Sequence, residues 1–403
     1  MTRRLPILFV LLTTTLDAIG IGLIFPVMPE LLREVADVGL SRAAVLGGLL
    51  ISAFAAMQFV FGPVVGNLSD AWGRRPVLLV SLAVMAPDYV VMALAQSFWL
   101  LMAGRILGGI VASTHATTTA CMADLSKPAE KAANFGLISA CFGIGFVIGP
   151  VIGGLLGDFG TRAPFWAAAG LAAANFAFGL AVMPETLDPT HRRAFSWARA
   201  NPFGAFRSLG RLPGLGPLLA VFLLYHVATQ VYPVIWAYFT AERFGWDTRL
   251  VGLSLTVYGI ALVIVQAWLI RVILRRLGEW MTVLAGFAWD VWAYAALAVI
   301  GSGFWAMILT PITAVGGITL PALQGVLSQA VPDDAQGELQ GVLGSLMAVA
   351  MIVSPILFSG VFTLFTGPDA PVYLPGAPFA LSILLVAPGI AIFLRARPRG
   401  AGM

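Results

Sequence analysis

Apolar runs of about 20 residues recur along the whole chain, and they constrain its fold more than any other feature. Each run is long enough to cross about 30 Å of hydrocarbon as an α-helix, which rises about 1.5 Å per residue. Since 59% of the 403 residues are hydrophobic and only 10% are charged, a soluble domain of this length is excluded. The sequence therefore predicts an all-α integral membrane protein. We place twelve transmembrane helices near residues 6–28, 43–66, 77–95, 98–121, 134–157, 164–183, 215–238, 250–272, 280–300, 303–326, 337–364 and 374–395.

The chain has 23 Lys and Arg residues, and the distribution of all but Arg105, which lies in a predicted span, indicates the orientation. Seventeen fall on the side that holds both termini, and the other side holds only Arg33, Arg42, Arg162, Arg243 and Arg249. The first group includes Arg3, Arg4, Arg192, Arg193, Arg207, Arg211 and Arg397. By the positive-inside rule both termini are cytoplasmic, which requires an even number of spans. The basic charge is thus an orientation signal, and no nucleic-acid partner is expected.

The longest polar stretch, from Pro184 to about Pro213, divides the predicted spans six and six. We therefore expect a six-helix bundle over residues 1–190, a cytoplasmic linker over 191–212, and a second six-helix bundle over 213–403.

The two halves also echo each other at a shift of about 200 residues. Arg74 and Arg75 correspond to Arg275 and Arg276, Asp88 to Asp290, and Pro150 to Pro355. Together with the six-plus-six division, these matches favour pseudo-symmetric bundles related by an axis along the membrane normal. A binding site is then expected between the bundles, at the middle of the membrane.

Four ionisable residues interrupt the predicted spans: Asp17, Asp88, Arg105 and Asp290. Each charge costs about 2.5 to 3.5 kcal/mol at the centre of a membrane helix, so they are expected to serve the function. From the helix rise, all four lie in one layer, the three carboxylates about 15 to 18 Å from the cytoplasmic surface. An ion pair of Arg105 with Asp17 or Asp88 is the purely structural alternative. Three acids against one base still leave a carboxylate unpaired, which suits reversible protonation near neutral pH.

The short loop between the second and third spans, GNLSDAWGRRP, combines small, acidic and basic residues. Gly66 and Gly73 permit a tight backbone, Asp70 can accept hydrogen bonds, and Arg74 and Arg75 supply forked donors. These residues favour a functional cluster at the membrane surface or, equally, an ordinary cytoplasmic turn with orienting arginines.

The fifth span carries small residues at helical spacing, and they predict close contact with another helix. The set is Gly145, Gly149, Pro150, Gly153 and Gly154. The glycines let two backbones approach closely, and the proline frees a carbonyl and can kink the helix. Tight packing alone is one interpretation; the other is a seal toward the periplasm that breaks when the protein opens outward.

These motifs resemble those of the major facilitator superfamily. GNLSDAWGRRP resembles its loop motif, Arg105 within LMAGRILGGI its fourth-helix motif, and GIGFVIGPVIGG the fifth-helix motif of its drug/proton antiporters. The resemblance narrows to the twelve-helix bacterial tetracycline/proton antiporters through LDAIGIGLIFPVMPELLRE, the Asp88-Tyr89 pair, RFGW, GGITLPALQGVLS and QGELQG. It covers essentially the whole chain.

The resemblance implies roles for individual residues. Asp17, Asp88 and Asp290 match carboxylates linked to substrate and proton handling, and Arg105 matches the proton-coupling arginine. Asp70, Arg74 and Arg75 match the loop gate, whereas Gln58 and Gln266 match polar positions of the transport path.

One position departs from the pattern. Many tetracycline antiporters have a His in the eighth helix, where this chain has Leu262. His115 and His226 lie in other spans and are more simply packing residues. The substrate, tetracycline-like or broader, is therefore left open.

The expected function is proton-coupled efflux of a small amphipathic drug by alternating access in a bacterial inner membrane. The proton gradient supplies the energy, without a cofactor or a resident metal, although the substrate could arrive as a metal chelate; twelve spans can form a complete monomer. The residues expected to contact the substrate are Gln58, Gln230, Tyr232, Trp236, Gln266 and Trp289. A proton-coupled uptake symporter of a small organic solute is the alternative. A non-transporting receptor or an enzyme is a more remote one, since no H-E-x-x-H, nucleophile elbow or Walker loop is present.

Overall fold

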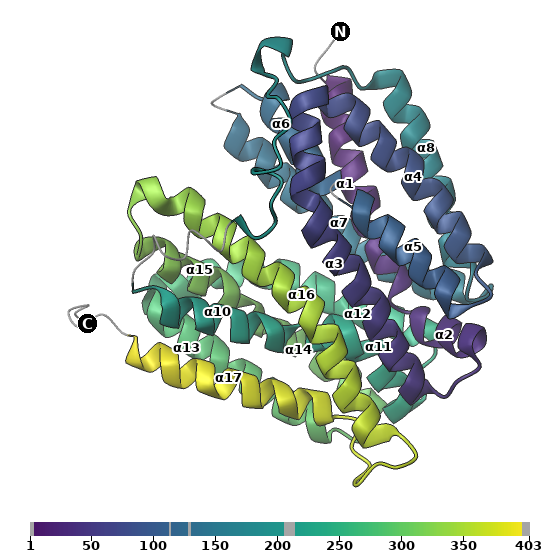
Figure 1. Ribbon diagram of the computed structural model, residues 1–403. Helices are drawn as coiled ribbons and strands as arrows, with labels where there is room; N and C mark the ends of the chain where they lie inside the picture. Colours follow the sequence, from purple (N-terminus) through teal and green to yellow (C-terminus); the bar gives the residue numbers. More distant parts are fainter. Residues whose placement is uncertain (1–3, 113, 128–129, 205–213, 397–403) are drawn as a thin grey trace. The chain divides into compact units, whose positions relative to one another are not determined.

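The computed structural model describes residues 4–112, 114–127, 130–204 and 214–396. Every regular element in these ranges is a helix (Figure 1). Arg3, Arg207, Arg211 and Arg397, which contribute to the charge argument, and part of the predicted linker lie outside the described residues.

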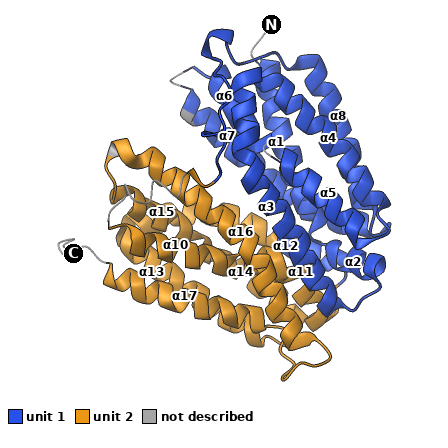
Figure 2. Cartoon of the chain, viewed as in Figure 1, with its two compact units in different colours: residues 1–202, 247–256 blue, residues 203–246, 257–403 orange. Residues whose placement is uncertain are grey.

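The chain divides into two compact units, coloured separately in Figure 2. Unit 1 comprises residues 1–202 together with 247–256, and unit 2 comprises 203–246 together with 257–403. The predicted domain limits at 190 and 213 stay a prediction.

Unit 1 is built from the first helices of the chain. They are α1 (Arg4–Ile24), α2 (Met28–Ala36), α3 (Leu40–Trp72), α4 (Arg74–Leu94), α5 (Phe98–Val111), α6 (Thr114–Leu125), α7 (Lys131–Gly157) and α8 (Ala163–Val182), followed by the short 3₁₀ helix η1 (Pro189–His191). The predicted first span, 6–28, is too long by four residues. The chain turns after Ile24, and Pro29 lies in the first turn of α2, where its missing N–H has no partner to lose.

Unit 2 contains more interrupted spans. Its helices are α10 (Gly216–Thr229), α11 (Val231–Phe244), α12 (Thr248–Ile264), the π-helical turn η3 (Val265–Leu269), α13 (Ile270–Val299), α14 (Gly303–Thr313), the 3₁₀ segment η4 (Ala314–Ile318), α15 (Thr319–Gln329), the 3₁₀ turn η5 (Asp333–Ala335), α16 (Gln336–Thr366) and α17 (Ala377–Arg395). The beginning of α12 belongs to unit 1. The predicted span 303–326 is thus two α-helices joined by η4.

Eleven helical stretches of the described chain are long and apolar enough to cross a membrane. The longest, Thr248–Val299, has 52 residues and would extend about 78 Å as one helix, more than twice the hydrocarbon thickness. Gly278 breaks it with φ 72° and ψ 173°. This break falls between the predicted spans 250–272 and 280–300, so the prediction of a twelve-span, all-α membrane fold is confirmed.

Glycines with a positive φ recur in the two halves at a shift of about 205 residues. Gly73, with φ 109°, precedes α4, and Gly278 occupies the same kind of turn within α13, about 205 residues later. Measured from these glycines, Asp290 comes three residues earlier than Asp88, which is nearly one helical turn. The correspondence of the two aspartates at a shift of 202 stays a prediction.

Helices α1 and α7 approach each other closely along a stripe of glycines spaced four residues apart. A Cβ on Gly149 would lie 2.8 Å from the carbonyl oxygen of Ile19. A Cβ on Gly145 would clash with the Thr15 carbonyl, and one on Gly153 with the Leu23 carbonyl. Since real Cβ atoms are not found at such distances, this helix pair depends on glycine at all three positions.

This packing predicts different effects for two glycines of α7. Gly145→Ala is expected to lower the free energy of unfolding by about 1 to 3 kcal/mol, because the added methyl group overpacks the α1 contact. Gly143→Ala, two residues away, points into open space and should leave the protein as stable or slightly more so. Thermal unfolding of both variants in the same detergent measures the difference, and equal melting temperatures would contradict the prediction.

Candidate functional site

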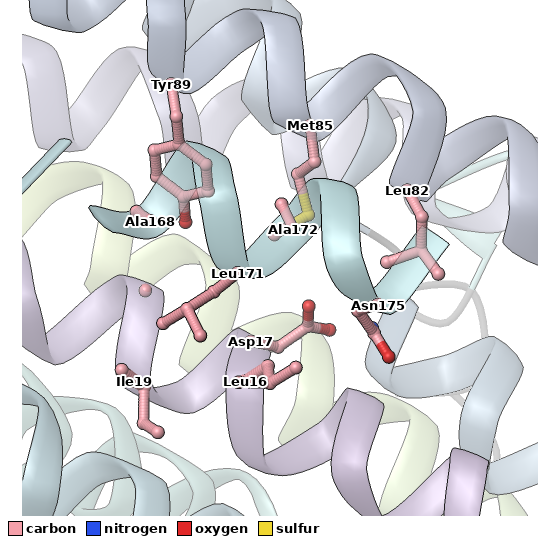
Figure 3. A pocket seen from close by; sticks show the side chains of 11 residues that line it. Leu16, Asp17, Ile19, Leu82, Met85, Tyr89, Ala168, Leu171, Ala172 and Asn175 are labelled. Carbon is pink, nitrogen blue, oxygen red and sulfur yellow. The ribbon is translucent and has the colours of Figure 1, made fainter. Parts of the chain in front are cut away.

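Asp17 projects from α1 into a small cavity that α1, α4 and α8 enclose (Figure 3). The lining residues are Leu16, Asp17, Ile19, Gly20, Leu82, Met85, Tyr89, Ala168, Leu171, Ala172 and Asn175. Its volume is about 10 Å³, close to the space that one water molecule needs. Among the described residues the Asp17 carboxylate has no hydrogen-bond or ion-pair partner. Asn175 exchanges hydrogen bonds with Thr13, and sequence reasoning missed both residues.

Asp88 is buried in a notch formed by two glycines of α5. Only 6% of the residue is exposed. A Cβ on Gly104 would lie 3.0 Å from its Oδ1 atom, and one on Gly108 would lie 2.9 Å from Oδ2. Oδ1 has no hydrogen-bond partner within the described chain. The neighbouring Tyr89 points to the other side of α4 and lines the Asp17 cavity, so this dipeptide joins the two carboxylate sites.

Arg105 forms neither of the ion pairs considered from the sequence. Its Nη2 atom donates to the Met92 sulfur at 2.8 Å, and its guanidinium lies 5.1 Å from the centre of the Phe54 ring. No carboxylate in the described ranges lies within ion-pair distance of it. A cation over an aromatic face is stabilised by about 0.5 to 2 kcal/mol, so Phe54 partly replaces the missing anion. None of the three membrane carboxylates thus forms an ion pair with a basic residue of the described chain.

Asp290 lies in unit 2 and is the most completely enclosed of the three carboxylates. Only 3% of the residue is exposed. The Tyr225 hydroxyl donates to its Oδ2 atom at 2.7 Å, and the Thr319 hydroxyl donates to the same atom at 3.4 Å. Gly316 of η4 is bare on the side that faces the carboxylate, and a side chain there would collide with it. Sequence reasoning missed Tyr225, although it is a polar residue within an apolar span.

An aromatic cluster holds two of the predicted substrate residues. The Tyr232 ring lies 5.7 Å from that of Tyr258 and 5.6 Å from that of Tyr294, and it also contacts Trp236 at 6.5 Å. The hydroxyls of Tyr232 and Tyr294 are buried without a hydrogen-bond partner in the part of the chain that is described. Tyr232 and Trp236 are thus packed within an aromatic cluster.

The other predicted substrate residues lie at helix ends and breaks or bond to the backbone near them. Gln58 donates to the Ala112 carbonyl at 3.2 Å, where α5 ends, and Trp289 donates to the Ile312 carbonyl at 3.1 Å. Gln230 separates α10 from α11, and Gln266 is exposed in the π-helical turn η3. Gln58 belongs to unit 1 and the remaining five residues to unit 2, so a common substrate site stays a prediction.

Both intramembrane histidines pack against phenylalanine. The His226 ring stacks on Phe222 at 5.8 Å, and the His115 ring meets the edge of Phe142 at 5.3 Å. No hydrogen bond in the described chain joins either histidine side chain to one of the three carboxylates. Leu262, at the position of the absent histidine, packs against Gly317.

The loop motif is held by Glu185, a residue that the sequence analysis missed. The backbone N–H groups of Arg74 and Arg75 donate to its Oε1 and Oε2 atoms at 2.8 and 3.3 Å, so Glu185 caps the start of α4. Its carboxylate occupies the space where a Cβ on Gly73 would lie. Gly73 is thus required both for this contact and for its positive φ, whereas Gly66 lies inside α3 with open space around it. The tight backbone predicted at Gly66 is wrong.

The arginines of the motif make several polar contacts. Arg74 forms an ion pair with Asp70 at 2.6 Å and a weaker one with Asp124 at 3.4 Å. Arg75 donates to the Leu180 carbonyl at 3.1 Å. This network is more specific than the orienting charges of an ordinary turn. Its role as a gate stays a prediction.

The glycines of α7 form two faces, whereas the sequence analysis combined them in one. Gly145, Gly149 and Gly153 face α1. A Cβ on Gly154 would instead lie 3.0 Å from the Thr248 carbonyl oxygen and 3.2 Å from Gly252 Cα, at the beginning of α12. Gly252 in turn packs on the carbonyl of Pro150, and sequence reasoning missed it.

Twelve spans with buried carboxylates and broken helices define a multi-pass membrane transporter. The sequence model of the Major Facilitator Superfamily matches residues 10–355, and the chain belongs to this family. It is similar to the class C tetracycline resistance protein of Escherichia coli, with 41% identity over 88% of this chain and 89% of the relative. It is also similar to the class G tetracycline resistance protein of Vibrio anguillarum, with 40% identity over 89% of this chain and 90% of the relative.

A solved structure supports the same fold. The human organic anion transporter MFSD10 (TETRAN) superposes with a TM-score of 0.70 and 25% identity, covering 98% of this chain and 100% of that one.

The Glu185 cap can be tested directly. Glu185→Ala removes the acceptors of two backbone N–H groups and is expected to lower the free energy of unfolding by about 1 to 3 kcal/mol. Hydrogen exchange at the amides of Arg74 and Arg75 should accelerate. Glu130→Ala removes an exposed carboxylate with one weak backbone contact and serves as the control. Unchanged exchange at the start of α4 in Glu185→Ala would show that the cap is not maintained.

Proposed function

We propose that this protein exports a small amphipathic drug, tetracycline-like or broader, in exchange for protons. The observation that carries the proposal is the set of three membrane carboxylates, Asp17, Asp88 and Asp290, none of which forms an ion pair among the described residues. A carboxylate in this position is stabilised by taking up a proton, and it can release that proton when water reaches it. The similarity to tetracycline resistance proteins supports a drug as the exchanged substrate.

The energy available from protons is sufficient for accumulation against a gradient. Each proton that moves inward releases about 2.3 kcal/mol per 100 mV of membrane potential. A pH difference of one unit adds about 1.4 kcal/mol. One proton can therefore sustain a concentration ratio of tenfold or more for its substrate.

The glycine faces support a mechanism of alternating access. The stripe that faces α1 and the separate contact with Thr248 and Gly252 make α7 a rigid element with two close-packed partners. Such packing favours discrete arrangements, because side chains cannot fill intermediate ones. We infer that the contact of α7 with the start of α12 forms and breaks during the cycle.

The remaining assignments belong to the same proposal. Gln58, Gln230, Tyr232, Trp236, Gln266 and Trp289 contact the substrate, and Asp70, Arg74 and Arg75 gate the cytoplasmic side. The protein acts as a monomer in a bacterial inner membrane with both termini in the cytoplasm, and needs no cofactor. A substrate that arrives as a metal chelate is compatible with carboxylates that form no ion pair among the described residues.

Two neutralising substitutions test the proton assignment. Asp17→Asn and Asp290→Asn should each abolish substrate flux driven by a pH gradient, because neither side chain can then exchange a proton. Both substitutions preserve shape and should leave the melting temperature nearly unchanged. Fluorescence of tetracycline in everted membrane vesicles reports the flux, and Asp158→Asn, at an exposed helix end, is the control. Undiminished proton-driven flux in both variants would refute the assignment.

The direction and breadth of transport need a separate experiment. Cells that lack their main efflux systems and express this protein should resist tetracycline-like drugs, and a protonophore should remove the resistance. A panel of dissimilar amphipathic drugs then measures breadth. Increased drug accumulation in the expressing cells would instead indicate an uptake symporter.

A further inference from the structure

In unit 2, the side chains of Asp290 and Thr319 each pack against a glycine on the other's segment. The Asp290 carboxylate fills the space beside Gly316, and the Thr319 side chain fills the space beside Gly286, one turn before Asp290 on α13. Thr319 also donates to Asp290. Helix α13 and the junction of η4 with α15 are therefore held in one register, with the carboxylate at the contact.

Tyr225 reaches this contact from α10 with a single hydroxyl proton and two possible acceptors. The Asp290 Oδ2 atom lies 2.7 Å from its hydroxyl oxygen, and the Gly316 carbonyl oxygen lies 3.3 Å from it. One proton cannot serve both acceptors well. An ionised carboxylate is the stronger acceptor, in agreement with the shorter of the two distances.

We propose that Tyr225 is a positioning residue that transmits the protonation state of Asp290 to the 3₁₀ segment η4. When Asp290 is ionised, Tyr225 donates to its carboxylate. When Asp290 takes up a proton, its new O–H donates to the Tyr225 oxygen, and the Tyr225 proton turns to the Gly316 carbonyl. The only covalent bond formed is the O–H bond of Asp290, and its proton comes from the transport pathway.

The backbone at Gly316 is suited to respond to this change. Its carbonyl already accepts the N–H of Thr319, the 3₁₀ hydrogen bond that closes η4. A 3₁₀ segment inside a membrane-spanning helix is a recognised place for a hinge. A second donor at this carbonyl changes the relative stability of the 3₁₀ and α-helical forms of η4. Protonation of Asp290 therefore alters the backbone preference at the junction of α14 with α15.

The surroundings of Asp290 contain few groups that could supply the same effect. Besides Tyr225, the titratable side chains near it are Tyr232 of α11, Tyr258 of α12 and Tyr294 of α13. Within the described chain none of them hydrogen-bonds to Asp290, and no Lys, Arg or His forms an ion pair with it. Tyr225 is thus the titratable neighbour in direct contact.

Infrared difference spectroscopy with a pH step tests the proposal on the purified full-length protein. In the wild type, the C=O band of the Asp290 carboxyl and a tyrosine C–O band should change together, and both should be missing in Asp290→Asn, whereas the carboxyl bands of Asp17 and Asp88 remain. In Tyr225→Phe the tyrosine band should vanish and the carboxyl band should move to higher frequency, because the Asp290 O–H has lost its acceptor. Proton-driven flux in proteoliposomes should fall about tenfold, the effect expected for one lost hydrogen bond to a charged group.

Tyr258→Phe is the matched control, since it removes a nearby hydroxyl that does not bond to Asp290; its carboxyl band and flux should match the wild type. A Tyr225→Phe carboxyl band at the wild-type frequency, or a wild-type pH step without a tyrosine change, overturns the proposal. The proposal rests on the coupling role proposed for Asp290, and the two fail differently. Proton-driven flux retained in Asp290→Asn refutes that role, whereas flux lost there but intact in Tyr225→Phe refutes only the relay.

Discussion

The absence of water in the hydrocarbon layer is the constraint on which the rest of this structure depends, because every polar group must find its partner within the protein. Most groups do so locally, as where Gln58 binds the carbonyl at the end of α5. Asp17 and Asp88 are exceptions. Asp88 lies against bare glycines, and one of its oxygens has no hydrogen-bond partner in the part of the chain that is described. Asp17 borders a cavity with the volume of about one water molecule. A carboxylate, unlike an arginine, can lose its charge by binding a proton, and the proposed exchange uses this property.

Glycine provides the space in which these carboxylates and backbones meet. The same device recurs where Gly73 admits Glu185, where Gly108 admits Asp88, and where Gly316 admits Asp290. In each case a carboxylate takes the position that a Cβ would fill. Small residues in this chain therefore position acidic groups as well as allowing helices to approach.

Much of the fold could be predicted from the sequence, since apolar runs and the cost of buried charge act over single helices. The twelve spans and the family followed from them, and from motifs such as GNLSDAWGRRP. Contacts between distant residues could not be predicted in this way. Glu185 lies more than 100 residues from the amides that it caps, and Tyr225 lies 65 residues from Asp290. The two faces of the α7 glycines likewise depend on the partner helices, which one sequence does not name.

Because Glu185 caps α4, the loop from Gly66 to Pro76 depends on a residue outside it. Arg74, Arg75 and Gly73 are contiguous, but the acid that completes their arrangement arrives after the sixth span of the bundle. A chimaera that exchanged only the segment from Gly66 to Pro76 would combine the loop of one protein with the Glu185 position of another, and the two would not have to fit. The loop and its capping residue are therefore expected to be inherited together, as parts of one bundle. Selection should remove recombinants whose crossover lies between the second and sixth spans, because these separate the two.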